Sequence, residues 1–462
     1  MPINVTTHYD RRKVAKESEG HLMISIKAED KNHKRTPVCT VLCLDTSGSM
    51  NEFSGGQAKI EILKNTCRKI IENLTEDDQI AIIGFATGSR VILERRKVLN
   101  KAELFDTINR LIATGNTNMS SGILESIHQV DEGFKGVKRL MVLTDGQANT
   151  GISDTPGLVK MCKERDSSCS ISTFGFGLSA NQDLLKKVSD ECGGNYYYIP
   201  DGNDVGVVFA RELGGITSCM AQNITLEITP GKNEVLELLN EFRNEKTDKK
   251  FTIFVDDIYA GETKHILVRM KVVDERVAKV HLSFDHLKKS KRITDDYDIK
   301  VDIVKAEDAD KDPILLVQEQ VAILKAAKAQ LQAVVYANAG NFTLAQSVLR
   351  GASEGLKWCI GEGSSYCSSA DSALQGSMAM FSSSNYTPDF ANVVHNSASN
   401  ATKMRGGAVS YSCCRGVGGD AGSVGLQGFV GLSDVYTTDA AKDMEANFDD
   451  KKKAKKKKDG KK

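Results

Sequence analysis

Oxygen-bearing side chains stand at every second position where one strongly apolar segment ends. The segment VCTVLCLD (38–45) ends in Asp45, and Ser47 and Ser49 follow at intervals of two residues. Carboxylate and hydroxyl oxygens are ligands of hard cations such as Mg²⁺, Mn²⁺ and Ca²⁺ rather than of Zn²⁺. The pattern therefore predicts a divalent-cation site. The alternative for this segment alone is a glycine- and serine-containing turn that caps a helix.

A second aspartate and a threonine extend the predicted site. The apolar segment KRLMVLTD (138–145) also ends in an aspartate, Asp145, and the small polar segment ATGNTNMSSG (113–122) contains Thr117. In an open parallel sheet, ligands bind beyond the carboxyl ends of the strands, at the point where the strand order reverses. If the sheet order is 3-2-1-4-5-6, Asp45 and Asp145 face one crevice and the Thr117 loop lies over it.

The hydroxyl groups of the predicted site decide what a bound cation can do. Hydroxyl oxygens are neutral, so a cation held mainly by serine and threonine keeps its attraction for one more anionic ligand, such as an Asp or Glu of a partner protein. A phosphatase of the haloacid dehalogenase type also begins with an apolar strand that ends in aspartate. That chemistry needs a second aspartate two residues later as general acid, and here the position is Ser47.

Strand and helix signals alternate between residues 38 and 214. The predicted strands are 38–45, 78–87, 90–95, 138–145, 170–177 and 195–200. The predicted helices include the amphipathic segment 57–74, 102–112 and 117–130. This alternation is typical of an α/β fold with a doubly wound, mostly parallel sheet that is covered on both faces.

The flanking segments have different patterns. A strand at 21–30 precedes the α/β region, and residues 221–305 contain strands without long helices between most of them, which predicts an all-β sandwich. We expect the α/β domain to be inserted into this sandwich or docked beside it. The expected domains are listed in chain order: N-terminal strands that pair with the sandwich (1–36), the α/β domain (37–216), the sandwich (217–306), a helical region (307–405) and a disordered Gly-rich, then Lys-rich tail (406–462).

Composition narrows the cellular context. The 11 cysteines have irregular spacings without paired metal-ligand motifs, which favours reduced thiols in a cytoplasmic protein over disulfides or a zinc site. We find neither a signal peptide nor an apolar run of the roughly 18 residues that a transmembrane helix needs. These features predict a soluble, intracellular chain.

The last twelve residues carry a separate charge. Lys451–Lys462 contains nine lysines and one aspartate, a net charge of +8, so the preceding 450 residues carry −8. Three interpretations stay open: a solvated tail, a tether to nucleic acid or an anionic membrane, and an arm that docks on the acidic body. Aromatic residues do not interleave with the lysines, so we expect no specific nucleic-acid readout.

Three motifs together resemble a known metal site. The segment D-x-S-x-S (45–49), the threonine in GNTNMSSGI (115–123) and TDG (144–146) resemble the metal-ion-dependent adhesion site of von Willebrand factor A domains. The resemblance covers about residues 38–214. It implies that Ser47, Ser49 and Thr117 bind the metal directly, that Asp45 and Asp145 act through water, and that an acidic partner residue takes the open position.

The order of the flanking regions also resembles that of intracellular A-domain proteins of bacteria and plants, in which a sandwich and helices follow the A domain. From these patterns we expect a non-enzymatic protein-interaction module that depends on Mg²⁺, Mn²⁺ or Ca²⁺. Two alternatives remain. One is an assembly scaffold in which the sandwich and helices make the contacts and the metal site is vestigial. The other is a metal-dependent hydrolase.

Overall fold

The computed structural model describes residues 3–404 except 30–34, 55, 131–132, 165–168, 178–179, 200–211, 213–217 and 288–290. The chain folds into two compact units, one formed by residues 33–219 and the other by the segments on either side of it. The segment predicted to be a disordered tail (406–462), with its lysine-rich end, lies outside the described residues.

A six-stranded sheet forms the centre of the unit of residues 33–219. Its order is β11-β10-β9-β4-β7-β8. The strands are β4 (Val38–Asp45), β7 (Gln79–Phe85), β8 (Ser89–Lys97), β9 (Val137–Thr144), β10 (Cys169–Phe176) and β11 (Gly193–Ile199). Only the pairing of β7 with β8 is antiparallel within this sheet. In chain order the sheet reads 3-2-1-4-5-6, the order required for the two aspartates to face one crevice.

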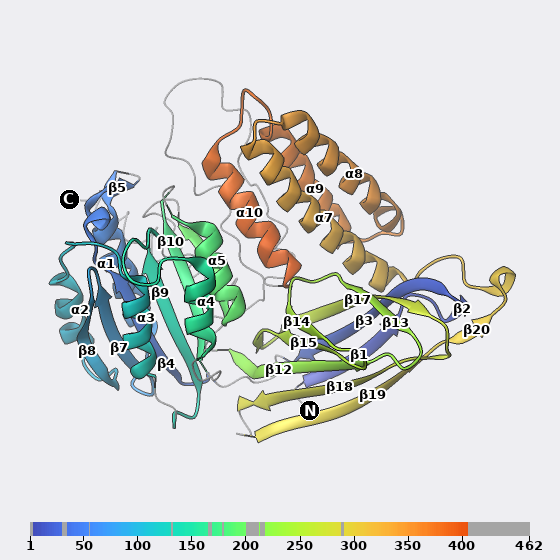
Figure 1. Ribbon diagram of the computed structural model, residues 1–462, viewed down its shortest axis with the longest axis horizontal. Coiled ribbons are helices and arrows are strands. Elements are labelled where there is room, and N and C mark those ends of the chain that lie inside the picture. The colour runs from blue at the N-terminus through green and yellow to red at the C-terminus, as the bar shows by residue number, and fades with distance from the viewer. Residues whose placement is uncertain are drawn as a thin grey trace, which may run out of the picture. The chain divides into compact units, whose positions relative to one another are not determined.

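Helices cover this sheet on both faces, since every residue of β4, β9 and β10 is buried. They are α1 (Lys59–Asn73), α2 (Lys101–Asn109), α3 (Met119–His128), α4 (Thr155–Lys163) and α5 (Gln182–Glu191) (Figure 1). Helix α1 begins two residues later than predicted, because Gln57–Ala58 pair with Phe53–Ser54 as the short hairpin β6–β5. The predicted doubly wound α/β fold is confirmed.

The second unit contains a sandwich of two sheets. One has the order β1-β3-β17-β13 and the other β14-β15-β12-β18-β19. The bounds are β1 (Ile3–Tyr9), β3 (Ser18–Ala28), β12 (Cys219–Thr229), β13 (Glu234–Leu238), β14 (Arg243–Lys246), β15 (Phe251–Val255), β17 (Thr263–Val272), β18 (Arg276–His286) and β19 (Lys291–Lys300). The short strand β16 (Ile258–Tyr259) pairs with β12, and β2 (Lys13–Ala15) and β20 (Asp302–Val304) form a separate two-stranded sheet. Because β3 pairs with β17 across the α/β unit in the sequence, that unit is an insertion into the sandwich.

Four helices pack beside the sheet that contains β17 (Figure 1). They are α7 (Leu315–Asn338), α8 (Phe342–Gly361), α9 (Ser365–Met380) and α10 (Pro388–Thr402). Val317, Val321 and Leu324 of α7 form one buried cluster with Met23 of β3 and Leu267 of β17. The helical region therefore shares a core with the sandwich. Within the described part of the chain, we find no helix with the length and apolar character needed to span a bilayer.

Candidate metal centre

The two aspartates lie at the carboxyl ends of neighbouring strands. Asp45 is the last residue of β4, Asp145 follows the last residue of β9, and both are fully buried. Asp45 Oδ1 accepts a hydrogen bond of 2.8 Å from the Ser47 amide, and Asp45 Oδ2 accepts one of 2.6 Å from Thr144 Oγ1. The Asp45 carboxylate is thus fixed by its own turn on one side and by strand β9 on the other.

Ser47 and Ser49 lie in the turn that follows β4. Ser47 precedes a single 3-10 turn, η1 (Gly48–Asn51), and its Oγ lies 3.1 Å from Ser49 Oγ. Although Ser47 occupies the cap position, its hydroxyl makes no capping hydrogen bond to the described amides of η1. The capping alternative therefore does not account for this hydroxyl, which is buried beside a second one.

The Thr117 loop is hydrogen-bonded to this turn. The Gly48 amide donates to the Gly115 carbonyl at 2.9 Å, and the Thr114 amide donates to the Thr46 carbonyl at 2.7 Å. Gly115 has a φ of +81°, and a Cβ added there would lie 2.7 Å from Thr87 Oγ1. Glycine is therefore required at position 115 both for its backbone conformation and for the close approach of the loop.

The loop after Asp145 holds Thr117 from the other side. The Thr117 amide donates to Asn149 Oδ1 at 2.9 Å, and the Thr117 carbonyl accepts from the amides of Asn149 and Thr150 at 3.0 and 3.2 Å. Thr117 itself is buried. All three segments that carry the predicted ligands are consequently joined by hydrogen bonds. Ser47 contacts both Asp45 and Ser49, and Thr117 and Asp145 lie on the adjoining loops.

The site contains two buried carboxyl groups, those of Asp45 and Asp145. Burial raises the pKa of Asp45 to about 6, with the charge of Asp145 adding to the effect and the hydrogen bonds from Ser47 and Thr144 opposing it. Asp145 Oδ2 accepts a hydrogen bond of 3.2 Å from Lys59 Nζ. Asp145 Oδ1 is buried, and no described residue donates a hydrogen bond to it.

These observations fit a cation site of the predicted type. A buried carboxylate oxygen without a donor is costly unless a cation or water completes it. Within the described residues, no three His, Cys, Asp or Glu side chains converge as a metal-binding group. A cation at this place would draw on hydroxyl oxygens as well as on the two carboxylates, so Ser47, Ser49, Thr117, Asp45 and Asp145 are the residues that could hold it.

Four residues that shape the site had no role predicted from the sequence: Thr144, Asn149, Lys59 and Glu52. Thr144 directly precedes Asp145, and its place at a strand end next to a carboxylate was a usable signal. Lys59 lies on the buried face of α1, an unusual place for a lysine, and this burial depends on the fold rather than on the local sequence. Nothing in the sequence indicated Asn149 or Glu52, because their contacts depend on how the loops fold.

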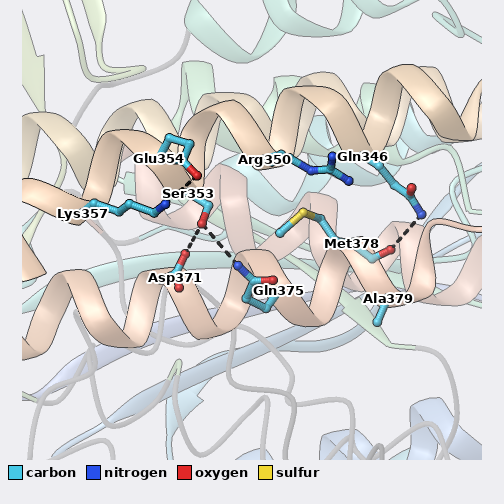
Figure 2. A pocket seen from close by; sticks show the side chains of 9 residues that line it. All are labelled: Gln346, Arg350, Ser353, Glu354, Lys357, Asp371, Gln375, Met378 and Ala379. Atoms are coloured by element: carbon cyan, nitrogen blue, oxygen red, sulfur yellow. Dashed lines mark hydrogen bonds and ion pairs between the residues drawn. The ribbon is translucent and has the colours of Figure 1, made fainter.

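A cavity lies between α8 and α9 (Figure 2). This cavity of about 590 Å³ is lined by Gln346, Arg350, Ser353, Glu354, Lys357, Asp371, Gln375, Met378 and Ala379. Most of its polar groups bind one another: Ser353 Oγ donates to Asp371, Gln375 donates to Ser353, and Lys357 pairs with Glu354. Side chains that already satisfy each other make a weaker ligand site than the strand ends of the α/β unit.

Comparison with known proteins agrees with the geometry. The family described as von Willebrand factor type A domain matches residues 40–211, which include all five predicted ligands. The α/β unit has the fold of a von Willebrand factor type A domain. The A domain accounts for the sheet order and for the position of the site at the strand ends.

Two curated relatives match a little under half of the chain. The uncharacterized protein YfbK of Escherichia coli is 31% identical over 212 residues, which are 45% of this chain and 36% of that protein. The uncharacterized protein sll0103 of Synechocystis is 29% identical over 218 residues, 46% of this chain and 50% of that protein. The chain thus spans at most half the length of these two relatives.

Solved structures resemble the fold beyond the A domain. A von Willebrand factor type A protein from Catenulispora acidiphila has a TM-score of 0.64 at 16% identity and covers 80% of this chain and 89% of its own. The ArnB paralog VWA2 from Sulfolobus acidocaldarius has a TM-score of 0.58 at 12% identity and covers 87% and 98%. At these identities the likeness shows a shared fold, which takes in the sandwich and helices as well.

Proposed function

We propose that the A domain binds protein partners through a divalent cation, Mg²⁺ or alternatively Mn²⁺ or Ca²⁺. Ser47, Ser49 and Thr117 would bind the cation directly, and Asp45 and Asp145 would act through water. An Asp or Glu side chain of the partner would complete the coordination. The match of residues 40–211 to the A-domain family and the hydrogen bonds between the three ligand-bearing segments support this proposal.

The observation that carries the proposal is the Oδ1 atom of Asp145. It is buried without a hydrogen-bond donor among the described residues, at the end of β9 and next to β4, which ends in Asp45. A water bound to a cation is the kind of donor that this oxygen lacks. The Ser47 and Ser49 hydroxyls, 3.1 Å apart, add neutral oxygens from the neighbouring turn.

The chemistry of the ligands favours binding over catalysis. Neutral hydroxyl ligands leave a bound cation electron-poor, so it attracts a further anion. The residues at the site offer no histidine or thiol, and position 47 holds serine where a phosphatase of the haloacid dehalogenase type needs its acid. We therefore propose an interaction module rather than an enzyme, with a phosphatase assay that stays silent as the corresponding expectation.

Partner capture by the immobilised full chain tests the proposal. We expect a set of proteins that is retained with Mg²⁺, lost with EDTA, and lost in Asp145→Asn. Asp154→Asn is the matched control, because Asp154 caps α4 by accepting a 2.8 Å bond from the Gly157 amide and asparagine caps equally well. Equal capture with Mg²⁺ and EDTA would favour the scaffold alternative, in which the sandwich and helices make the contacts.

We also propose that the chain works in a reducing compartment such as the cytoplasm. None of the nine described cysteines forms a disulfide, and all nine are buried. The lysine-rich segment Lys451–Lys462 remains a candidate for contact with an anionic partner, since its net charge of +8 opposes the −8 of the preceding residues.

A further inference from the structure

A buried lysine reaches the candidate metal centre from helix α1. Lys59 Nζ lies 2.8 Å from Glu52 Oε2 and 3.2 Å from Asp145 Oδ2, and the lysine is only 3% exposed. Its stem packs at the end of β10, where a Cβ on Gly177 would lie 3.6 Å from Lys59 Cε. The two carboxylates hold the ammonium group and the packing of the stem holds the rest of the side chain, so Lys59 does not extend into solvent.

Lys59 and the site share a single carboxylate. Asp145 Oδ2 is bonded to Lys59, while Asp145 Oδ1 is the buried oxygen without a described donor. This division leaves one oxygen for a cation or its water and gives the other to a fixed positive charge. A positive charge on the same carboxylate repels an incoming cation and lowers the negative charge that the protein offers it.

We propose that Lys59 is a built-in counter-charge that weakens cation binding at this centre and makes the bound cation depend more strongly on an anionic partner. The inference rests on the proposed metal-dependent function and adds how the site is tuned. Two carboxylates would neutralise most of the charge of a divalent cation, and Lys59 restores one positive charge. The cation then needs an acidic residue from outside to complete its neutralisation.

Glu52 should have the opposite effect on cation affinity. The Glu52 side chain is 64% exposed and pairs with Lys59 from the solvent side. Removing its charge takes one negative charge away from Lys59, so the net positive charge beside Asp145 increases. Lys59 and Glu52 should therefore shift cation affinity in opposite directions, although neither is among the proposed ligands.

Calorimetric titration of the full chain with Mg²⁺ tests the inference. Lys59→Met removes the charge but keeps an unbranched stem, and we expect it to bind Mg²⁺ roughly tenfold more tightly than the wild type. Glu52→Gln should bind about two- to threefold more weakly, a smaller effect because Glu52 is exposed to solvent. Lys64→Met is the matched control on the same helix, since Lys64 pairs with Glu61 at 2.8 Å, and it should leave affinity unchanged.

The measured affinities distinguish a failure of the inference from a failure of the proposed function. Tighter binding by Lys59→Met and weaker binding by Glu52→Gln support the inference. If the wild type binds Mg²⁺ but Lys59→Met binds equally or less tightly, the counter-charge role is wrong while the metal site stands. If neither the wild type nor Lys59→Met binds, the proposed function fails and the inference with it. Glu52→Gln, a surface change, decides the matter if Lys59→Met does not fold, because unchanged or tighter binding by it overturns the inference.

Discussion

Thr144 Oγ1 donates a hydrogen bond of 2.6 Å to Asp45 Oδ2, although the two residues are 99 positions apart in the chain. The bond joins the carboxyl ends of β4 and β9, the two neighbouring strands that carry the aspartates of the candidate centre. Thr144 Oγ1 also accepts a hydrogen bond of 2.9 Å from the Gly146 amide, so the loop after Asp145 begins on the same hydroxyl. One side chain thus positions both halves of the site.

Replacing Thr144 by valine should damage stability and cation binding together. Thr144→Val removes the donor to a buried carboxylate, which should lower the free energy of unfolding by about 1–3 kcal/mol and raise the pKa of Asp45 further. Thr173→Val is a matched control, because Thr173 Oγ1 is also buried and donates at 2.8 Å to the Leu185 carbonyl, away from the aspartates. Urea unfolding with and without Mg²⁺ should show a reduced Mg²⁺ effect in Thr144→Val only; the same Mg²⁺ effect in both variants would contradict this role.

The approach of the Thr117 loop should be sensitive to a single methyl group. Gly115→Ala forces alanine into a φ of +81° and places its Cβ 2.7 Å from Thr87 Oγ1, so the loop or Thr87 must move. Gly340→Ala has a similar φ of +75° but no atom within 4 Å of the added Cβ. Both variants should lose about 1 kcal/mol of stability from the backbone conformation. Only Gly115→Ala should also weaken Mg²⁺ binding, and equal affinities in the two variants would argue against the loop as part of the site.

The sandwich should lose stability in mild acid through His265. Burial, assisted by the charge of His8, lowers the pKa of His265 in β17 to about 4. The unfolded state has a histidine pKa of about 6.5, so as the pH falls from 6.5 to 4 the unfolded state binds a proton that the folded state does not. The folded state should therefore lose up to about 3 kcal/mol over this interval and nothing from this group above it.

The variant His265→Gln isolates that effect. Unfolding free energies measured between pH 7 and pH 4.5 should fall less steeply in His265→Gln than in the wild type. His281→Gln serves as control, because His281 is 40% exposed and pairs with Asp296 on the surface of the sandwich. A wild-type slope in His265→Gln would show that His265 is protonated equally in both states.

The sheet and the candidate ligands were accessible from sequence because the relevant signals are local. The middle residues of segments 38–45 and 138–145 are mostly apolar, since both faces of β4 and β9 are covered, and the aspartate at the end of each segment stands out against them. The alternating pattern of residues 38–214 then leaves one common fold class, in which strand ends carry the site.

Helices α9 and α10 were harder to predict from the sequence, for a physical reason. Helices α9 and α10 lie in a serine-rich segment with weak apolar periodicity, and α9 buries polar side chains that find partners on other helices. Gln330 of α7 donates at 2.9 Å to the buried Ser377 Oγ of α9. This hydrogen bond adds to the apolar contacts that α9 makes, several of them through small residues such as Ala370 and Ala373, and neither contribution gives a strong hydrophobic pattern.

The burial of Lys59 could not be predicted from the sequence, for a related reason. Its burial depends on Asp145, which is 86 residues further along the chain. A lysine in an amphipathic helix is ordinarily placed on the solvent side, and only the tertiary contact shows that this one points into the centre. Contacts of this range are properties of the fold rather than of any local segment.

The midpoint of thermal unfolding of the full chain, measured against Mg²⁺ concentration, tests the central claim most directly. A cation that binds only the native state raises the midpoint by mass action, so the wild-type midpoint should rise with Mg²⁺. Ser47→Ala should abolish the rise, and Ser372→Ala, which alters an exposed serine of α9, should keep it. A wild-type midpoint that stays flat with Mg²⁺, Mn²⁺ and Ca²⁺, or a Ser47→Ala midpoint that rises as far as the wild type, would contradict a cation held by these five residues.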